Sequence, residues 1–128
     1  MTATTQRCGI DSVEIARIER LLAQNAIEAL SRFFTPQELA DAGDGPGRAA
    51  SLAARFAAKE ALLKAIGTGL RQHMRWRDIE VCRDALGKPR LRLYGYLQER
   101  CLTEGIQHIH LSLAHSATCA IAQVILER

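Results

Sequence analysis

The sequence predicts an α+β fold, a single domain in which an antiparallel sheet packs against one long central helix. A long alanine-rich helical pattern in the middle of the chain and alternating apolar residues near its C-terminus carry this prediction. The 128 residues have the size of one domain and contain no internal repeat, linker or low-complexity tract. We therefore expect one domain over residues 9–128, preceded by a partly frayed segment over residues 1–8.

The first third of the chain is typical of a strand followed by helices. A weak strand signal covers residues 8–13, and from Glu14 onward apolar residues recur at spacings of three and four. A second short helix is expected over residues 26–33. The next helix has the clearest start in the chain. Thr35 is a good N-cap residue, a proline fills the first helical position, and Glu38 completes a capping box.

The longest helix is expected over residues 48–66, after a loop rich in glycine. Its large apolar residues define a core face, and alanines fill most of the remaining positions. A glycine-containing turn at residues 67–69 ends it, as glycine does at helix C-termini. Because the helix is rich in alanine nearly all round, we expect close packing on several of its sides.

The last two strands carry the strongest β signal. Apolar residues alternate with histidine, serine and alanine over residues 108–114, and after a short turn residues 119–126 are almost entirely apolar. These two segments predict an antiparallel hairpin. Between the central helix and this hairpin we expect a basic loop at residues 70–77 and a strand at residues 79–83. A turn at residues 87–89, a strand at residues 90–94 and a helix at residues 97–104 should follow.

Arginine supplies most of the positive charge. The formal net charge is +3, and only three of the 17 basic residues are lysines, at positions 59, 64 and 88. The planar guanidinium fork suits phosphate and carboxylate groups, although a GC-rich genome would give the same bias. The charge excess is too small to indicate nucleic-acid binding by itself.

Cysteine usage and hydropathy favour a cytoplasmic protein. The four cysteines contain no C-x-x-C pair, so the sequence gives no support to a zinc-ribbon or thioredoxin-like site. No leader with a basic start and an apolar run is present, and no apolar stretch is long enough to span a membrane. We expect free thiols in a reducing cytoplasm and no membrane partner.

Four charged residues interrupt the central helix. Arg55 and Lys59 lie four residues apart, as do Glu60 and Lys64. Spacing alone favours two solvated charge pairs. The alanine-rich surroundings weaken that interpretation, because charges on a closely packed helix require partners or a ligand.

Two further residues are candidates for chemistry. Asp11 follows a predicted strand and precedes a helix, so its carboxylate either binds a metal or caps that helix. His115 ends the motif Ser-Leu-Ala-His near the hairpin turn, where a structural role is the simpler interpretation. His108 and His110 share a strand face, but no further ligand follows at zinc spacing, and we expect no zinc site.

Taken together, these segments resemble the holo-acyl-carrier-protein synthases over residues 9–126. The central run from Arg55 to Gly69 is similar to the family signature R-F-A-A-K-E-A-x-x-K-A-x-G-T-G. The other matching segments are Gly9-Ile10-Asp11, Arg17-Ile18, Phe34-Thr35-Pro36-Gln37-Glu38, Trp76-Arg77-Asp78-Ile79-Glu80-Val81, Gly87-Lys88-Pro89 and Leu111-Ser112-Leu113-Ala114-His115.

Three positions depart from the family pattern. Residues 5–8 replace an apolar segment that usually contains another glycine, and Ser12 replaces a β-branched apolar residue. Because of both departures, the sequence does not decide how well ordered the first strand is. Ala114 stands where the family has the second serine of S-L-S-H, so a hydroxyl is missing beside the expected site.

The resemblance implies a Mg²⁺-dependent phosphopantetheinyl transferase. Such an enzyme moves the 4′-phosphopantetheine arm of coenzyme A to a serine of apo acyl carrier protein and releases adenosine 3′,5′-bisphosphate. A divalent cation and basic groups suit this reaction, because negative charge builds on the phosphate oxygens. The pathway implied by default is fatty acid biosynthesis; a carrier protein of a secondary, polyketide pathway is an alternative.

The resemblance also assigns residues. Asp11 and Glu60 are the expected Mg²⁺ ligands, and Lys64 is expected at the transferred phosphate or the leaving group. These three are the expected catalytic residues, and folding must bring them together. The proton acceptor for the serine is left open between Glu60 and a metal-bound water. The expected CoA-binding residues are Arg55, Lys59, Lys64, Gly67, Thr68, Gly69, Lys88, Pro89 and His115.

The partners implied are an apo carrier protein and two further copies of the chain. Carrier proteins present an acidic helix, and Arg17 matches the family's docking position; Arg20 is our own addition. The family implies a homotrimer with CoA bound between neighbouring subunits. Two alternatives are a family member that only binds its ligands and a small RNA-binding domain. The RNA-binding reading would use the arginines at 71, 75, 77, 83, 90 and 92, but aromatic residues make up only 5% of the chain.

Overall fold

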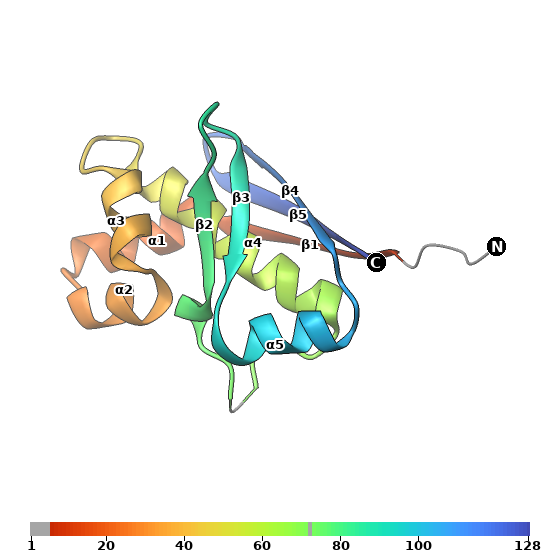
Figure 1. The fold of residues 1–128 in the computed structure, drawn as a ribbon. Coiled ribbons are helices and arrows are strands. Elements are labelled where there is room, and N and C mark those ends of the chain that lie inside the picture. Colours follow the sequence, from red (N-terminus) through yellow and green to blue (C-terminus); the bar gives the residue numbers. More distant parts are fainter. Residues whose placement is uncertain (1–5, 72) are drawn as a thin grey trace.

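Helix α4 (Arg48–Ile66) crosses the middle of the molecule, and the other elements are arranged around it (Figure 1). The computed structural model describes residues 6–71 and 73–128. Buried residues of α4 lie on every side of the helix, which confirms the close packing expected from its alanines. The helix ends at Gly67, whose φ of 93° is the left-handed conformation predicted for that glycine.

A three-stranded antiparallel sheet covers one side of α4. Its strands are β1 (Gln6–Glu14), β4 (His108–His115) and β5 (Cys119–Glu127), in the order β1-β5-β4. Every second residue of β5 is buried against the helix, from Ala120 to Leu126, and the residues between them are exposed or half-buried. The same alternation in β1 leaves the outer face of the sheet open among the described residues.

The remaining elements form two smaller groups. A two-stranded sheet of β2 and β3 lies across α4, and Figure 1 shows the three short helices together at one end of the molecule. The bounds are α1 (Ile15–Ala23), α2 (Ile27–Phe33), α3 (Pro36–Ala42), η1 (Trp76–Asp78), β2 (Ile79–Arg83), β3 (Pro89–Leu93) and α5 (Gly95–Thr103). The predicted α+β architecture is thus confirmed, with two antiparallel sheets in place of one.

The start of α3 has the local structure that its sequence predicts. The Thr35 hydroxyl accepts a hydrogen bond from the Glu38 backbone N–H at 3.2 Å, and the Glu38 carboxylate accepts one from the Thr35 N–H at 3.0 Å. This capping box is buried, because it faces β2. The Glu38 carboxylate can therefore also accept hydrogen bonds from other buried groups.

The N-terminal segment differs from expectation. Residues 6–8 belong to β1 and pair with β5, in the register Gln6 to Glu127 and Cys8 to Ile125. Arg7 donates to the Ile66 carbonyl and to the carboxylate of Glu104. The expected fraying does not hold for residues 6–8, and residues 1–5 lie outside the described part of the chain.

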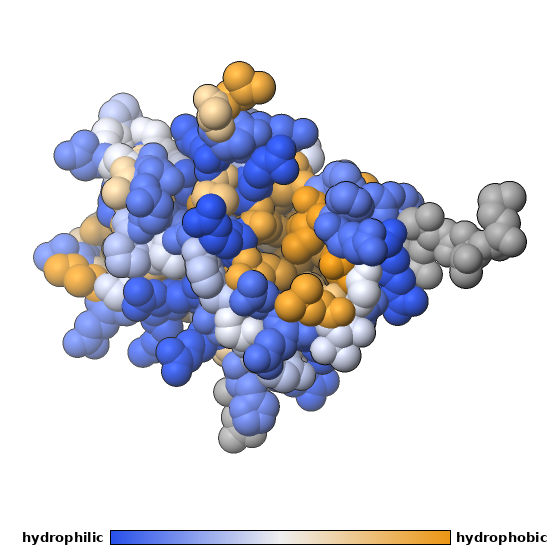
Figure 2. Space-filling view, viewed as in Figure 1, coloured by the Kyte–Doolittle hydropathy of each residue, from blue (hydrophilic) through white to orange (hydrophobic). Residues whose placement is uncertain are grey.

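Apolar side chains also gather between β3 and β4. Figure 2 shows them on this face, surrounded by hydrophilic residues. Leu91 and Leu93 of β3 and Ile109 and Leu113 of β4 are partly buried there. Within the described residues, no helix has the length and apolar character needed to cross a membrane.

Candidate active site

Asp11 and Lys64 meet where β1 crosses α4, although 53 residues separate them in the sequence. The Lys64 ammonium donates to the Asp11 carboxylate at 2.7 Å and to the Ile10 carbonyl at 3.2 Å. Glu60 lies one helical turn before Lys64 and is close enough to Asp11 for the negative charge of Asp11 to raise the pKa of Glu60. Folding therefore brings the three expected catalytic residues together.

Gly9 is the reason that β1 can approach α4 so closely. A Cβ atom at this position would lie 1.9 Å from the Ala61 carbonyl oxygen and 2.7 Å from the Ala65 nitrogen. Because side chains alternate along a strand, Asp11 lies on the same face as Gly9, toward α4. Glycine at position 9 thus places the carboxylate of Asp11 beside the charged residues of the helix.

The electrostatics of this junction are those of two carboxylates held together. Burial raises the pKa of Glu60, and the negative charge of Asp11 raises it further, while Lys64 and Arg17 partly offset both effects. The hydrogen bond to Asp11 raises the pKa of the Lys64 ammonium. The site therefore favours a cation beside Asp11 and Glu60.

The two carboxylates fit a Mg²⁺ ion. Mg²⁺ takes oxygen ligands, and it is held in proteins by one or two carboxylates together with water and substrate phosphates. Among the residues that the structure describes, no group of three or more His, Cys, Asp or Glu side chains is arranged to hold a metal. A pair consisting of Asp11 and Glu60 leaves most of an octahedral shell to other oxygens, as expected for a metal shared with a phosphate substrate.

The alternative role of Asp11 as a helix cap is excluded. The N-cap residue of α1 is Glu14, and no side chain caps this end of the helix. The solvated charge pairs considered for α4 do not occur either. Lys64 pairs with Asp11 and not with Glu60, and both Arg55 and Lys59 are buried.

A second cluster surrounds Arg55, nearer the N-terminus of α4. A cavity of about 250 Å³ is lined by Arg55, Arg83, Ala114 and His115, together with Ser51 and small residues of α4. Arg55 is only 3% exposed; it donates to the carbonyl and hydroxyl of Ser51, and its Nε atom has no partner. Burial lowers the pKa of Arg55, and the nearby Arg83 lowers it further. A buried cation beside a second cation is suited to binding an anion.

The cavity continues toward the turn between β2 and β3. An adjoining cavity of about 240 Å³ is lined by Arg55, Arg83, Pro89 and Leu113 among others. The two cavities share Arg55, and His115 lines the first and Pro89 the second, so these three predicted residues lie around one groove. Arg83 was not among the predicted site residues, because nothing in its local sequence distinguishes it from other exposed arginines.

Other predicted residues lie apart from this groove. Gly67, Thr68 and Gly69 follow the C-terminus of α4, twelve residues after Arg55, which corresponds to about 18 Å along a helix. Lys88 is exposed in the β2–β3 turn and does not line either cavity. Within one chain, the predicted CoA-binding residues therefore fall at two ends of α4.

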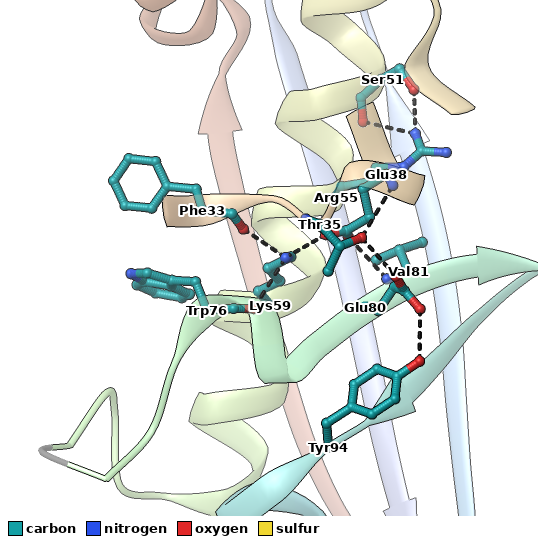
Figure 3. A network of polar contacts seen from close by, with 10 residues as sticks. All are labelled: Phe33, Thr35, Glu38, Ser51, Arg55, Lys59, Trp76, Glu80, Val81 and Tyr94. Carbon is teal, nitrogen blue, oxygen red and sulfur yellow. Dashed lines mark hydrogen bonds and ion pairs between the residues drawn. The ribbon is translucent and has the colours of Figure 1, made fainter. Parts of the chain in front are cut away.

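Lys59 is a correction to the expected site. Its side chain is fully buried, and its ammonium donates to the Glu38 carboxylate at 2.6 Å and to the carbonyls of Phe33 and Trp76 at 2.7 and 3.1 Å (Figure 3). An ammonium has three donors, and all three are used inside the protein. Lys59 therefore has no group left to contact CoA.

The two predicted docking arginines lie on α1. The guanidinium carbon of Arg17 is 5.5 Å from the centre of the Phe56 ring, a cation–π contact, and its charge reaches Glu60. Arg20 is exposed in the last turn of the same helix. Arg17 thus lies next to the carboxylate junction, where a protein substrate would have to present its acceptor group.

Comparisons with known proteins show which family this chain is similar to. Residues 7–122 match the model of the 4′-phosphopantetheinyl transferase superfamily. A holo-[acyl-carrier-protein] synthase from Geobacter sp. (strain M21) is 48% identical over 120 residues, which cover 94% of this chain and 96% of the relative.

Solved structures are similar as well. The holo-[acyl-carrier-protein] synthase of Neisseria meningitidis superposes with a TM-score of 0.85 at 35% identity, covering 95% of this chain and 98% of that one. The synthase of Bacillus anthracis, solved in complex with CoA (3′,5′-ADP), gives a TM-score of 0.79 at 37% identity and covers 98% of both chains.

Proposed function

The chain belongs to the 4′-phosphopantetheinyl transferase superfamily, and we infer from this membership how its site residues divide the work. The reaction is transfer of the 4′-phosphopantetheine arm of CoA to apo acyl carrier protein, which leaves adenosine 3′,5′-bisphosphate. The observation that carries the assignment of roles is the meeting of Asp11, Glu60 and Lys64 where β1 crosses α4.

Asp11 and Glu60 hold Mg²⁺ in this proposal. When bound, the ion neutralises charge on the pyrophosphate oxygens of CoA during transfer. Lys64 lies at the same junction and orients either the transferred phosphate or the leaving group through its ammonium. Glu60, whose pKa is raised by burial and by Asp11, is also suited to accept the proton of the attacking serine.

The groove around Arg55 receives the nucleotide end of CoA. Arg55 supplies a buried cation with an unused Nε donor, and Arg83 adds a second charge at the same cavity. His115 and Pro89 form the walls of the groove, next to the 3′-phosphate or the adenine. The missing hydroxyl at Ala114 falls within this wall.

We propose a homotrimer with one CoA between neighbouring subunits. Two features support it. The outer face of the three-stranded sheet exposes apolar side chains, with Ile10 58% and Ile121 43% exposed on adjacent strands. In addition, the CoA-binding residues of one chain lie at opposite ends of α4, so residues 67–69 of one subunit can complete the groove of the next.

The carrier protein docks on α1. Arg17 and Arg20 provide the positive charge that would steer an acidic carrier helix toward Glu60. Fatty acid synthesis is the default pathway, and a polyketide carrier protein is the alternative. A cytoplasmic location stays a prediction from the sequence.

Intact-mass spectrometry of an apo acyl carrier protein tests the reaction and its carboxylates. Wild-type protein with CoA and Mg²⁺ should add one phosphopantetheine mass to the carrier. Asp11→Ala and Glu60→Ala should each abolish the gain, while Glu99→Ala, which alters an exposed acidic residue on α5, should not. Binding of CoA without any mass gain, across several carrier proteins, would instead favour a family member that only binds.

Arg17→Glu tests the docking surface. Reversing this charge should raise KM for the carrier protein by about tenfold or more, because a repulsive contact of about 1.4 kcal/mol costs that factor. KM for CoA should change little. Steady-state kinetics with each substrate varied in turn give both values, and equal increases in both would contradict docking at Arg17.

A further inference from the structure

Lys59 lies next to the proposed metal ligand Glu60 in the sequence, but its side chain is buried inside the protein, whereas Glu60 is half-buried. Its ammonium is completely buried and contacts three oxygen atoms within 3.1 Å. Burying a charge is costly, and a buried ion pair rarely improves stability over apolar residues of similar size. The three directional contacts therefore call for an explanation other than stability.

The three acceptors come from three separate elements (Figure 3). Phe33 is the last residue of α2, Glu38 lies in the first turn of α3, and Trp76 begins η1. One ammonium on α4 thus holds the end of α2, the start of α3 and the start of η1 at fixed distances. We call this group, Lys59 with its three acceptors, the Lys59 clamp.

Further hydrogen bonds anchor the clamp to the two-stranded sheet. The second oxygen of Glu38 accepts the Val81 N–H at 3.0 Å, and the Thr35 hydroxyl donates to Glu80 at 2.6 Å. Glu80 also accepts a hydrogen bond from the Tyr94 hydroxyl at 3.0 Å. The carboxylates of the network are therefore satisfied. Among residues 6–71 and 73–128, only Lys59 links this network by hydrogen bonds to α4 and to the carbonyls of Phe33 and Trp76.

The clamp lies directly beneath a basic surface. Phe33, Phe56 and Trp76 pack edge-on or tilted, with ring centres 5.0 to 6.2 Å apart. Arg17 rests on the Phe56 ring. Trp76 also lines a cleft of about 340 Å³, together with three more arginines, at positions 32, 75 and 77.

We propose that Lys59 is a positioning residue: by binding the carbonyls of Phe33 and Trp76, it sets the spacing of the arginine-bearing segments that receive the carrier protein beside Glu60. The proposal rests on the proposed function. The two bound carbonyls belong to the residues directly next to Arg32 and to Arg75 and Arg77 in the sequence. Movement at either carbonyl would therefore shift these charges, as well as the rings that support Arg17.

The test replaces the clamp without leaving a lone buried charge. Lys59→Met alone would strand the Glu38 carboxylate, at a cost of about 3–5 kcal/mol, and could prevent folding. The double variant Lys59→Met/Glu38→Gln carries no charge at either position, and the new side chains are similar in volume to those they replace. Tyr94→Phe is the matched control, because it removes a hydrogen bond from the far end of the same network without touching the bound carbonyls.

Two readouts separate positioning from general weakening. KM for the carrier protein should rise about tenfold or more in the double variant, a loss of about 1.4 kcal/mol in docking, while KM for CoA changes less than about threefold. Trp76 is the only tryptophan in the chain, so its fluorescence reports on η1 directly. Its emission should shift to longer wavelength and become easier to quench in the double variant and not in Tyr94→Phe.

Each outcome decides the proposal. A folded double variant with unchanged Trp76 emission, or with equal changes in the two KM values, would overturn the positioning role. If the wild-type protein modifies no carrier protein, the proposed function fails, and direct titration of the basic surface with carrier protein together with Trp76 emission still tests the clamp.

Discussion

The Glu60 carboxyl group is harder to ionise than an ordinary glutamate, because it is half-buried and faces the charge of Asp11. Its raised pKa means that the folded protein holds this proton more tightly than the unfolded chain does. The contribution of Glu60 to stability is therefore greatest below its unfolded pKa of about 4.3, and it declines as pH rises through the folded value.

Glu60→Gln should remove this pH-dependent loss of stability. The variant keeps the volume of the side chain and removes its charge, so its free energy of unfolding should exceed that of wild type at about pH 7 and approach it at about pH 4. Urea denaturation at both pH values, without divalent cations, measures the difference. The same difference at both pH values would show that ionisation of Glu60 is not the cause.

Magnesium should have the opposite effect on the same pair of proteins. A ligand that binds only the folded state raises the melting temperature with its concentration. We expect Mg²⁺ to raise the melting temperature of wild type and to have little effect on Glu60→Gln. An equal rise in both proteins would place the ion away from Glu60.

Lys59 and Glu60 show that the role of a single charged residue cannot always be predicted from the sequence. Both are charged residues of α4, and the helix is apolar on every side, so periodicity does not reveal which charge faces a ligand. The partners that decide the question for Lys59 are mainly backbone carbonyls, 26 and 17 residues away. Any residue type could supply them. Arg83 escaped prediction for the same reason, since only the fold places it beside Arg55.

At the scale of elements, most of the structure could be predicted. The bounds of α4, β2 and the C-terminal hairpin follow from local signals, namely alanine content, alternation and the glycine at position 67. Residues 6–8 are the exception. Residues 6 and 7 carry no strand signal of their own, and the signal at Cys8 is weak. All three are extended because β5 supplies their hydrogen-bond partners.

Because β1 lies so close to α4 at Gly9, we expect this position to tolerate an added side chain poorly. Gly9→Ala would place a methyl group 1.9 Å from a carbonyl oxygen of the helix, so strand and helix must move apart. We expect a loss of about 3 kcal/mol in the free energy of unfolding, together with loss of transferase activity, because Asp11 moves with the strand.

Gly45→Ala is the matched control for this variant. Gly45 lies in the loop before α4, and a Cβ atom there would meet nothing within 4 Å. Denaturation curves and turnover should match wild type for Gly45→Ala. If Gly9→Ala also retained both, the close approach of β1 to α4 would not be what places Asp11.

At the scale of the whole molecule, the outer face of the three-stranded sheet is the candidate interface between copies of the chain. Sequence alternation predicts this face, whereas further copies of the chain were implied by the family resemblance and not by any pattern in these strands. Exposed isoleucines on adjacent strands are unfavourable in water and suit an interface between subunits. In the proposed trimer, the separation of the predicted CoA-binding residues along α4 would give the same interface a role in substrate binding.

Ile121→Glu tests both parts of this argument, because Ile121 lies on the central strand β5 and faces outward. A charge there should convert the proposed trimer to monomers in light scattering. It should also weaken CoA binding in calorimetry, since in this proposal each groove would lose the residues of its neighbour. Ile27→Glu, which alters a 65% exposed isoleucine on α2, should change neither measurement. A trimeric Ile121→Glu protein would exclude this sheet as the interface. A monomer with wild-type affinity for CoA would show instead that one chain forms the complete groove, and residues 67–69 would then need a role other than completing a neighbour's site.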